Sequence, residues 1–374
     1  MIKIGGFADP AFGAVADVFS RHFEDGLELG ARFTLINGGK TVVDLWAGHA
    51  DRAASKPFDD KTLTQVFSTT KALAALMIAR LVDAGDLAYD QAVAEAWPEF
   101  AQAGKAEITI EQALSHQAGL CGLHGPFEPL EWFNWDQIVE RIEAMVPLWP
   151  PGTASGYHPV TFGFIAGEIF RRVDGRTMAQ AFAEDLAGPM ELDMMIGVGQ
   201  DQRERVAELK RPASLPDFGE VTLPKRLAFL SPWSSPAGGA PGEARAAPIP
   251  STNGYATAEA LAKLMSALAG DGRLSGNQII SRETIAAASR QRVCGDDLVL
   301  PFEISWGAGF MRNQDLNIWG PGQETFGHAG WGGSAAFADP QTNLAGAYVM
   351  NRQDIHLIGD PRPQRLIEAA YMAL

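Results

Sequence analysis

The chain has 374 residues, 46% of them hydrophobic, and a formal net charge of −15. This size suffices for one large globular domain or two closely packed ones, and the acidic balance argues against nucleic acid or an anionic membrane surface as a partner. No apolar run reaches the length of a membrane span, no leader peptide is evident, and Cys121 and Cys294 are the only cysteines. We therefore expect a cytoplasmic protein with reduced thiols.

The first part of the chain predicts a helix followed by a hairpin. Residues 10–25 place their apolar side chains on one side of a helix. Residues 31–36 and 41–46 are rich in strand-forming side chains and flank Asn37-Gly38-Gly39. A tight hairpin turn needs positive φ, which Asn and Gly tolerate, so we expect two antiparallel strands here.

The rest of the chain separates helices from strands. Residues 72–208 are mainly helical in pattern, and residues 230–254 form an irregular segment rich in Pro, Gly, Ser and Ala. Helices are predicted over 110–114, 135–145, 160–173, 178–186, 257–268 and 362–374, and strands over 304–310, 335–338 and 344–350. We therefore expect an α/β sandwich built from residues 1–80 and 210–374, a mainly helical domain over 81–209, and a site at their interface.

Ser68-Thr69-Thr70-Lys71 lies at the start of a predicted helix that runs to about Gly85. If Ser68 opens the first turn, Lys71 lies one turn further along the same face. The positive end of the helix dipole favours an anion at the serine. A desolvated lysine can act as its base if its pKa falls several units below the reference value of about 10.4. The alternative is that Ser68 is only a helix N-cap, the commonest role of a serine in this place.

Tyr157 follows the sharp turn Pro150-Pro151-Gly152 and precedes a predicted helix. A phenol has a reference pKa of about 10, and it can act as a proton shuttle if a neighbouring ammonium favours the phenolate. The alternative is a buried tyrosine that closes a loop.

The segment from Phe326 to Ser334 contains four glycines around His328. A strand so rich in glycine allows close approach of a substrate, and its free main-chain N–H groups can stabilise an oxyanion. The alternative is a bulged strand with glycines for tight packing. A second segment, residues 127–135, is aromatic-rich from Phe127 onward, and it either lines an apolar pocket or packs as core.

Other chemistries lack their motifs. The seven histidines include no His-Glu-x-x-His or His-x-His spacing, so we expect no metal site. The sequence contains no Gly-x-Ser-x-Gly elbow, phosphate loop or dinucleotide fingerprint, and we expect no cofactor.

Four motifs occur in a recognisable order. They are Ser68-Thr69-Thr70-Lys71, Leu114-Ser115-His116-Gln117-Ala118-Gly119-Leu120, Pro151-Gly152 followed by Tyr157, and Gly327-His328-Ala329-Gly330. Across essentially the whole chain this pattern resembles the serine β-lactamase and penicillin-binding-protein superfamily, and within it the class C β-lactamase-like esterases of carboxylesterase family VIII. The resemblance implies an antiparallel sheet flanked by helices with an inserted, mainly helical domain. It also implies that Ser68 is the nucleophile, Lys71 its partner base and Tyr157 a proton relay, with the N–H groups of Ser68 and Trp331 as the oxyanion hole.

Two positions depart from the β-lactamase pattern. Pro159 replaces the asparagine that follows the tyrosine, and His328 replaces the strand lysine. Both lost groups would contact the amide and carboxylate of a β-lactam, so we expect a serine carboxylesterase that acts on small, uncharged esters. The residues expected to contact the substrate are His328, Ala329, Gly330, Trp331, Phe127 and His158.

Several alternatives remain at this point. The same scaffold can serve as a β-lactamase, a D-amino-acid peptidase or an acyltransferase. His328 could act as a triad base, although no partnered acid is evident. A non-catalytic binding module is a further alternative, against which the intact Ser68–Lys71 pair argues. The expected partner is a small-molecule ester, and the sequence leaves open its acyl chain length and the oligomeric state.

Overall fold

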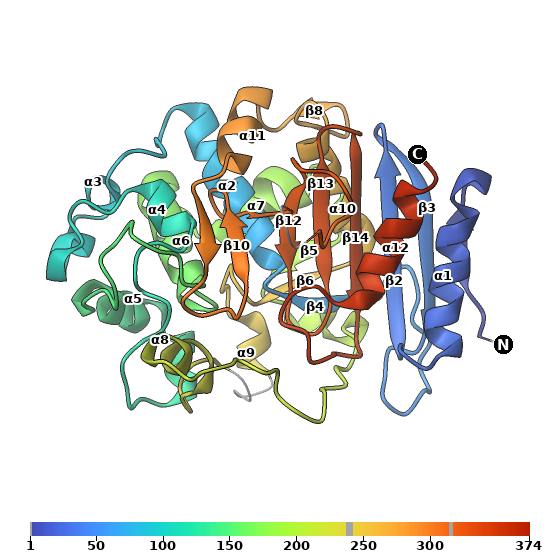
Figure 1. Ribbon diagram of the computed structural model, residues 1–374, viewed down its shortest axis with the longest axis horizontal. Helices are drawn as coiled ribbons and strands as arrows, with labels where there is room; N and C mark the ends of the chain where they lie inside the picture. The colour runs from blue at the N-terminus through green and yellow to red at the C-terminus, as the bar shows by residue number, and fades with distance from the viewer. Residues whose placement is uncertain (1, 237–241, 314–316) are drawn as a thin grey trace.

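A nine-stranded antiparallel sheet forms the centre of the computed structural model, which describes residues 2–236, 242–313 and 317–374 (Figure 1). The strand order is β1-β3-β2-β14-β13-β12-β11-β10-β9. The strands are β1 Gly5–Ala8, β2 Gly30–Asn37, β3 Lys40–Gly48, β9 Val293–Asp296, β10 Glu303–Trp306, β11 Met311–Arg312, β12 Phe326–Ala329, β13 Ala335–Asp339 and β14 Leu344–Met350. Because β14 pairs with β2, strands from both ends of the chain belong to one sheet.

The N-terminal hairpin is confirmed. Strands β2 and β3 pair antiparallel, with Asn37 opposite Lys40. Gly38 and Gly39 form the two-residue turn with φ of 57° and 77°, the conformation for which Asn-Gly sequences are selected.

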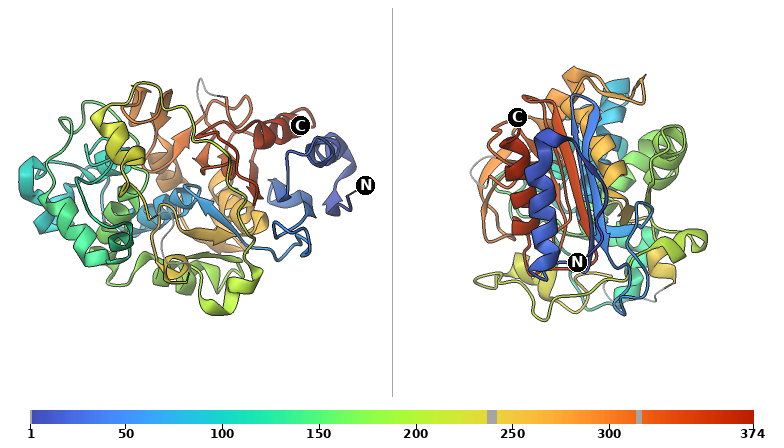
Figure 2. Two further views of the ribbon diagram at one scale, coloured as in Figure 1. Left: turned by 90° about the horizontal axis from the view of Figure 1, so that it is seen from below. Right: turned by 90° about the vertical axis from the view of Figure 1, so that its right-hand side faces the viewer.

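Helices cover both faces of the sheet (Figure 2). Helices α1 (Gly13–Glu24) and α12 (Pro361–Tyr371) lie on one face, and α10 (Ala258–Ala269) lies on the other together with α2 (Thr70–Ala84). Strand β14 shows why both faces are covered: Ala345, Ala347 and Val349 belong to one hydrophobic cluster, and Leu344, Tyr348 and Met350 to the other. Side chains alternate along a strand, so a strand that is apolar at every position needs a partner on each face.

A second, three-stranded sheet connects the main sheet region to the helical region. Its order is β4 (Thr64–Phe67), β6 (Gly254–Ala256) and β5 (Met194–Ile196). The helical region includes α3 Val93–Ala96, α4 Ile110–Leu114, α5 Trp135–Ala144, α6 Thr161–Asp174 and α7 Met178–Phe182, and the remaining short elements are α8 Leu223–Lys225, α9 Glu243–Ala246, α11 Arg282–Ser289, β7 Arg273–Leu274 and β8 Asn277–Gln278. The predicted helices in this region are confirmed to within a few residues, and the division into 1–80 with 210–374 and 81–209 stays a prediction.

Two segments differ from the predictions. The strand expected over 304–310 ends at Trp306, and the chain turns at residues 307–309. Gly309 has a φ of +85° there, and a Cβ on it would come within 2.8 Å of the Ala75 Cβ. The segment 230–254 contains the short helix α9, while its residues 237–241 lie outside the described part of the chain. None of the helices in the described ranges combines the length and hydropathy that crossing a bilayer requires.

Candidate active site

Ser68 lies in a sharp turn between β4 and α2. Phe67, immediately before it, has a φ of +46°, an uncommon conformation for a bulky residue that marks a strained position. The hydroxyl of Thr70 holds this turn, because it donates to the Phe67 carbonyl at 2.5 Å and accepts from the Gly254 N–H at 2.9 Å. Helix α2 begins two residues after Ser68, which therefore stands before its N-terminus and is not its cap. The side chain of Ser68 is half-buried.

Lys71 is fully buried directly behind Ser68. Its Nζ lies 3.1 Å from Ser68 Oγ and donates to the carbonyls of Pro159 at 2.8 Å and Ser251 at 3.1 Å. If the amine is neutral, the two carbonyls take both of its N–H donors, and its one lone pair is left for the proton of the serine hydroxyl. Burial holds the pKa of Lys71 well below its ordinary value, since a desolvated ammonium is disfavoured. A lowered pKa of this kind is what a lysine needs to act as a base.

Tyr157 is also buried beside this pair. Its hydroxyl shares a hydrogen bond with the side chain of Ser68, and Lys71 Nζ lies 4.8 Å from the centre of its ring. Burial raises the pKa of Tyr157 above its ordinary value, and the hydrogen bond to Ser68 offsets only part of this rise. This shift favours the neutral phenol, so the condition stated from the sequence, a phenolate favoured by a neighbouring ammonium, is not met in the resting site. The role of Tyr157 in proton transfer stays a prediction.

Two buried histidines attach the Tyr157 segment to the turn after α4. His158 interacts through Nδ1 with the Gly156 carbonyl at 2.6 Å, and its Nε2 accepts from the Leu120 N–H at 2.9 Å. His116 Nδ1 accepts from the His158 N–H at 3.1 Å. Both ring nitrogens of His158 are thus occupied and the residue is fully buried, which argues against its expected role in contacting the substrate. It is instead a support for its neighbour, Tyr157.

The glycine-rich segment packs directly against the main chain of the Ser68 turn, with no room for a side chain at Gly330. A Cβ on Gly330 would lie 2.3 Å from the Val66 carbonyl oxygen. The Ser334 hydroxyl donates to that carbonyl at 2.8 Å and lies 3.0 Å from Thr69 Oγ1. Gly330 is therefore needed for packing, and the strand itself ends at Ala329.

Trp331 follows Gly330 in this turn and is half-buried. Within the described residues, neither its main-chain N–H nor that of Ser68 makes a hydrogen bond. Two free donors on adjoining segments are what an oxyanion hole requires.

His328 lies on β12 and is buried. Its Nδ1 interacts with the Ala329 carbonyl at 2.7 Å, and its ring centre is 6.1 Å from that of Tyr157. Burial and the neighbouring Lys71 lower the pKa of His328 to about 3, so it is neutral over the ordinary pH range. Lys71, not His328, is the basic group next to Ser68 Oγ, which argues against His328 as a triad base.

The aromatic residues divide into two groups. Phe127 packs against Trp132 and Trp233, with its ring centre 5.8 and 6.3 Å from theirs, and its expected contact with the substrate stays a prediction. Phe229, which the sequence analysis missed, lies with its ring centre 6.4 Å from Tyr157 and 6.3 Å from Trp331. It belongs to a short helical turn, Arg226–Leu230, whose sequence carries no signal of proximity to the site.

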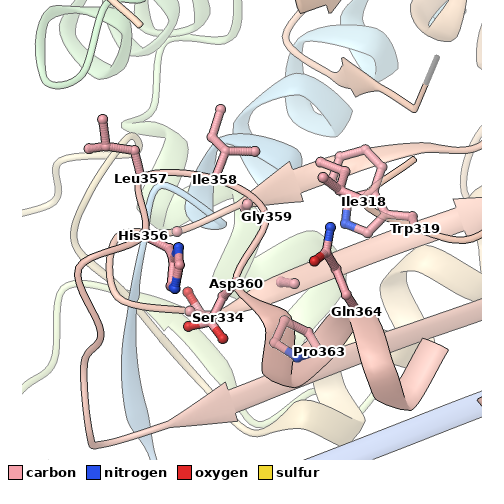
Figure 3. Close-up of a pocket in the computed structure, with 14 residues that line it drawn as sticks. Ile318, Trp319, Ser334, His356, Leu357, Ile358, Gly359, Asp360, Pro363 and Gln364 are labelled. Carbon is pink, nitrogen blue, oxygen red and sulfur yellow. The ribbon is translucent and has the colours of Figure 1, made fainter. Parts of the chain in front are cut away.

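A small cavity lies behind the turn of Gly330, between it and residues 356–364 (Figure 3). Its volume is about 10 Å³, roughly the room that one water molecule needs. Ala329 and Gly330 line it, but Ser68, Lys71 and Tyr157 do not, so it is not the space around the candidate nucleophile. The residues in the described ranges contain no group of three or more His, Cys, Asp or Glu side chains able to hold a metal ion.

Comparison with known proteins shows the family. Residues 19–370 match the Beta-lactamase family model. The chain is 36% identical to the Esterase/beta-lactamase LipL of Mycobacterium tuberculosis, over 94% of this chain and 83% of that protein. A penicillin-binding protein homolog from Caulobacter crescentus shares 58% identity with a TM-score of 0.97, and a family VIII carboxylesterase shares 40% with a TM-score of 0.94, each covering 100% of both chains. The resemblance inferred from the four motifs is therefore confirmed, and the chain belongs to the beta-lactamase family.

Proposed function

We propose that the protein is a serine carboxylesterase that hydrolyses small, uncharged carboxylic esters through an acyl-enzyme on Ser68. The observation that carries this proposal is the approach of Lys71 Nζ to 3.1 Å from Ser68 Oγ, with its other hydrogen bonds given to two carbonyls. The names of the relatives support ester chemistry, because LipL is called an esterase/beta-lactamase and a structural neighbour is a family VIII carboxylesterase.

Acylation begins with proton transfer from Ser68 to Lys71. Ser68 Oγ attacks the ester carbonyl, and the N–H groups of Ser68 and Trp331 bind the developing oxyanion. General base catalysis of this kind contributes about 10²- to 10⁴-fold, and one oxyanion donor about 10²- to 10³-fold.

The leaving alcohol takes its proton from Tyr157. As the C–O bond of the tetrahedral intermediate breaks, the neutral phenol protonates the alkoxide, and the ammonium of Lys71 restores the phenol. Water then attacks the acyl-enzyme with Lys71 as its base, and Ser68 regains its proton as the acid leaves.

The surroundings of the site favour an uncharged substrate. His328 is a neutral imidazole whose pKa is lowered to about 3. Pro159 contributes only its carbonyl, which accepts from Lys71. Neither position therefore offers a cation or a side-chain amide to a β-lactam carboxylate or a peptide. Hydrolysis of β-lactams is the second candidate, favoured by the dual name of LipL.

A comparison of substrates tests the proposal. We expect kcat/KM for short-chain p-nitrophenyl esters to exceed that for nitrocefin by at least about 100-fold, because a site without partners for the β-lactam polar groups discriminates against them. Esters of graded acyl length, measured with the same enzyme sample, give the chain-length preference. Rapid nitrocefin turnover with negligible ester hydrolysis would establish the second candidate instead.

Phe229 is expected to determine which esters fit. Its half-buried ring lies between Tyr157 and Trp331, and it would form one wall of the substrate site. We expect Phe229→Ala to lower kcat/KM for esters with aromatic groups about 10-fold, the usual cost of losing one aromatic contact. Methyl and ethyl esters should be affected less than about twofold.

The matched control is Phe7→Ala, which removes an exposed phenylalanine from the edge strand β1. It should leave both kinds of ester unaffected. Equal losses on aromatic and small esters in Phe229→Ala would show that Phe229 supports the fold and does not select the substrate.

A further inference from the structure

Asp297 is a buried carboxylate at the back of the site that the proposed mechanism does not use. It lies in the loop between β9 and β10. Its Oδ1 accepts three main-chain N–H groups, those of Tyr157, Val299 and Leu300, each at 2.9 Å. Two of these bonds close its own loop, and the third reaches a residue 140 positions earlier in the chain. Asp297 therefore links the segment that carries Tyr157 to the main sheet.

The second oxygen of Asp297 lies beside Trp306. Its Oδ2 is 3.4 Å from the indole Nε1, and the indole ring stacks on the Tyr157 ring with centres 5.6 Å apart and planes 5° apart. One carboxylate thus contacts both the main chain of Tyr157 and the ring that packs flat against the phenol.

Asp297 takes part in no ion pair within the described part of the chain. Burial raises its pKa, and the three N–H groups oppose this rise. The titratable groups that face Tyr157 are Lys71, His116 and His328, and Cys121 faces Asp297 from the turn after α4. A buried carboxylate without a counter-ion costs stability, so its presence next to Tyr157 calls for a functional reason.

We propose that Asp297 is a positioning residue, which fixes the ring of Tyr157 so that the phenol can protonate the leaving alkoxide. Its negative charge acts in the same direction, because it opposes formation of the phenolate and raises the pKa of Tyr157. This inference rests on the proposed function in one respect, the use of Tyr157 as the proton donor.

The leaving group separates this role from a purely structural one. A p-nitrophenolate leaves without a proton, whereas an alkoxide must be protonated as it leaves. We therefore expect Asp297→Asn, which keeps an oxygen for the three N–H groups, to lower kcat/KM for ethyl acetate about 10-fold. Asp297→Ala should lower kcat/KM for ethyl acetate about 100-fold, because misplacing a reacting group by about 1 Å can reduce the rate by this much. For p-nitrophenyl acetate, which has the same acyl group, both variants should lose less than about threefold.

Two further variants complete the experiment. Tyr157→Phe should show the same selective loss for ethyl acetate, and if it does not, the proposed role of Tyr157 itself is wrong. Asp339→Asn is the matched control, since Asp339 is another buried aspartate that accepts from a tyrosine, Tyr371, at 2.7 Å. It should affect the two esters equally or not at all.

If Tyr157→Phe discriminates between the esters and Asp297→Asn does not, Asp297 is only structural. A lower melting temperature with equal losses on both esters would lead to the same conclusion. Asp297→Asn alone decides the question if Asp297→Ala does not fold.

Discussion

Ser68→Ala is expected to abolish ester hydrolysis while leaving the protein folded. The nucleophile contributes to both acylation and deacylation, so kcat/KM for p-nitrophenyl acetate should fall by at least about 10⁴-fold. The fold should tolerate the change, because Ser68 is half-buried and its hydroxyl caps no helix. A fluorophosphonate probe should label the wild-type protein at Ser68 and leave the variant unlabelled.

Ser20→Ala provides the control for this measurement. Ser20 is also half-buried but lies on α1, on the far face of the main sheet. Its loss should change neither the rate nor the labelling. Wild-type turnover by Ser68→Ala would refute the mechanism, and an unlabelled wild-type protein without esterase activity would favour a non-catalytic binding module.

The parts of the fold that the sequence predicted are those with local signals. The hairpin turn at Gly38 and Gly39 needs two consecutive residues with positive φ, which Gly provides. Helix α4 begins after the N-cap Thr109, and β14 begins directly after a predicted turn. The predicted end of the strand over 304–310 was wrong. The strand breaks where Gly309 packs against Ala75 of α2, a residue more than two hundred positions away in the chain. No local pattern contains that contact.

The candidate site divides in the same way. Ser68 and Lys71 are three positions apart at the start of a helix, so their proximity follows from spacing. Tyr157 is a candidate from its place after a turn and before a helix, but only the resemblance to a family connects it with Ser68. Asp297 and Phe229 have no motif, and they reach the site only through tertiary packing. The protonation state of Tyr157 was also inaccessible from the sequence, because it depends on how deeply the phenol is buried.

Pro159 illustrates why a departure from a family motif need not remove function. Proline has lost the side-chain amide of the β-lactamase pattern, yet its carbonyl accepts from Lys71 at 2.8 Å. In the proposed mechanism, the main-chain contact that positions the base is thus made by a residue whose side chain cannot hold a β-lactam amide. The side chain at this position affects which substrates bind, whereas the main-chain carbonyl positions Lys71. A substitution can therefore change the first property and leave the second intact.

Lys71→Met is expected to lower kcat about 10³-fold or more, since it removes the base and keeps the length of the side chain. Lys71→Arg should be equally inactive, because a guanidinium does not lose its proton in this environment. In the wild-type enzyme kcat/KM should rise with pH as the Lys71 amine becomes neutral, with its midpoint well below the ordinary lysine pKa. His158 and His328, whose pKa values are lowered to about 3, would not produce this limb.

The same pKa shift of Lys71 makes a prediction for stability. Burial in the folded state holds the pKa of this amine well below its ordinary value, whereas the unfolded chain binds a proton up to a pH of about 10.4. Between the folded and unfolded pKa values the unfolded state therefore binds one more proton. The free energy of unfolding should then rise with pH in the wild type. Its slope should exceed the slope of Lys71→Met by about 1.4 kcal/mol per pH unit. Urea unfolding at several pH values within this window measures both slopes. Parallel slopes would mean that Lys71 keeps its proton in the folded state, and the serine would then need another base.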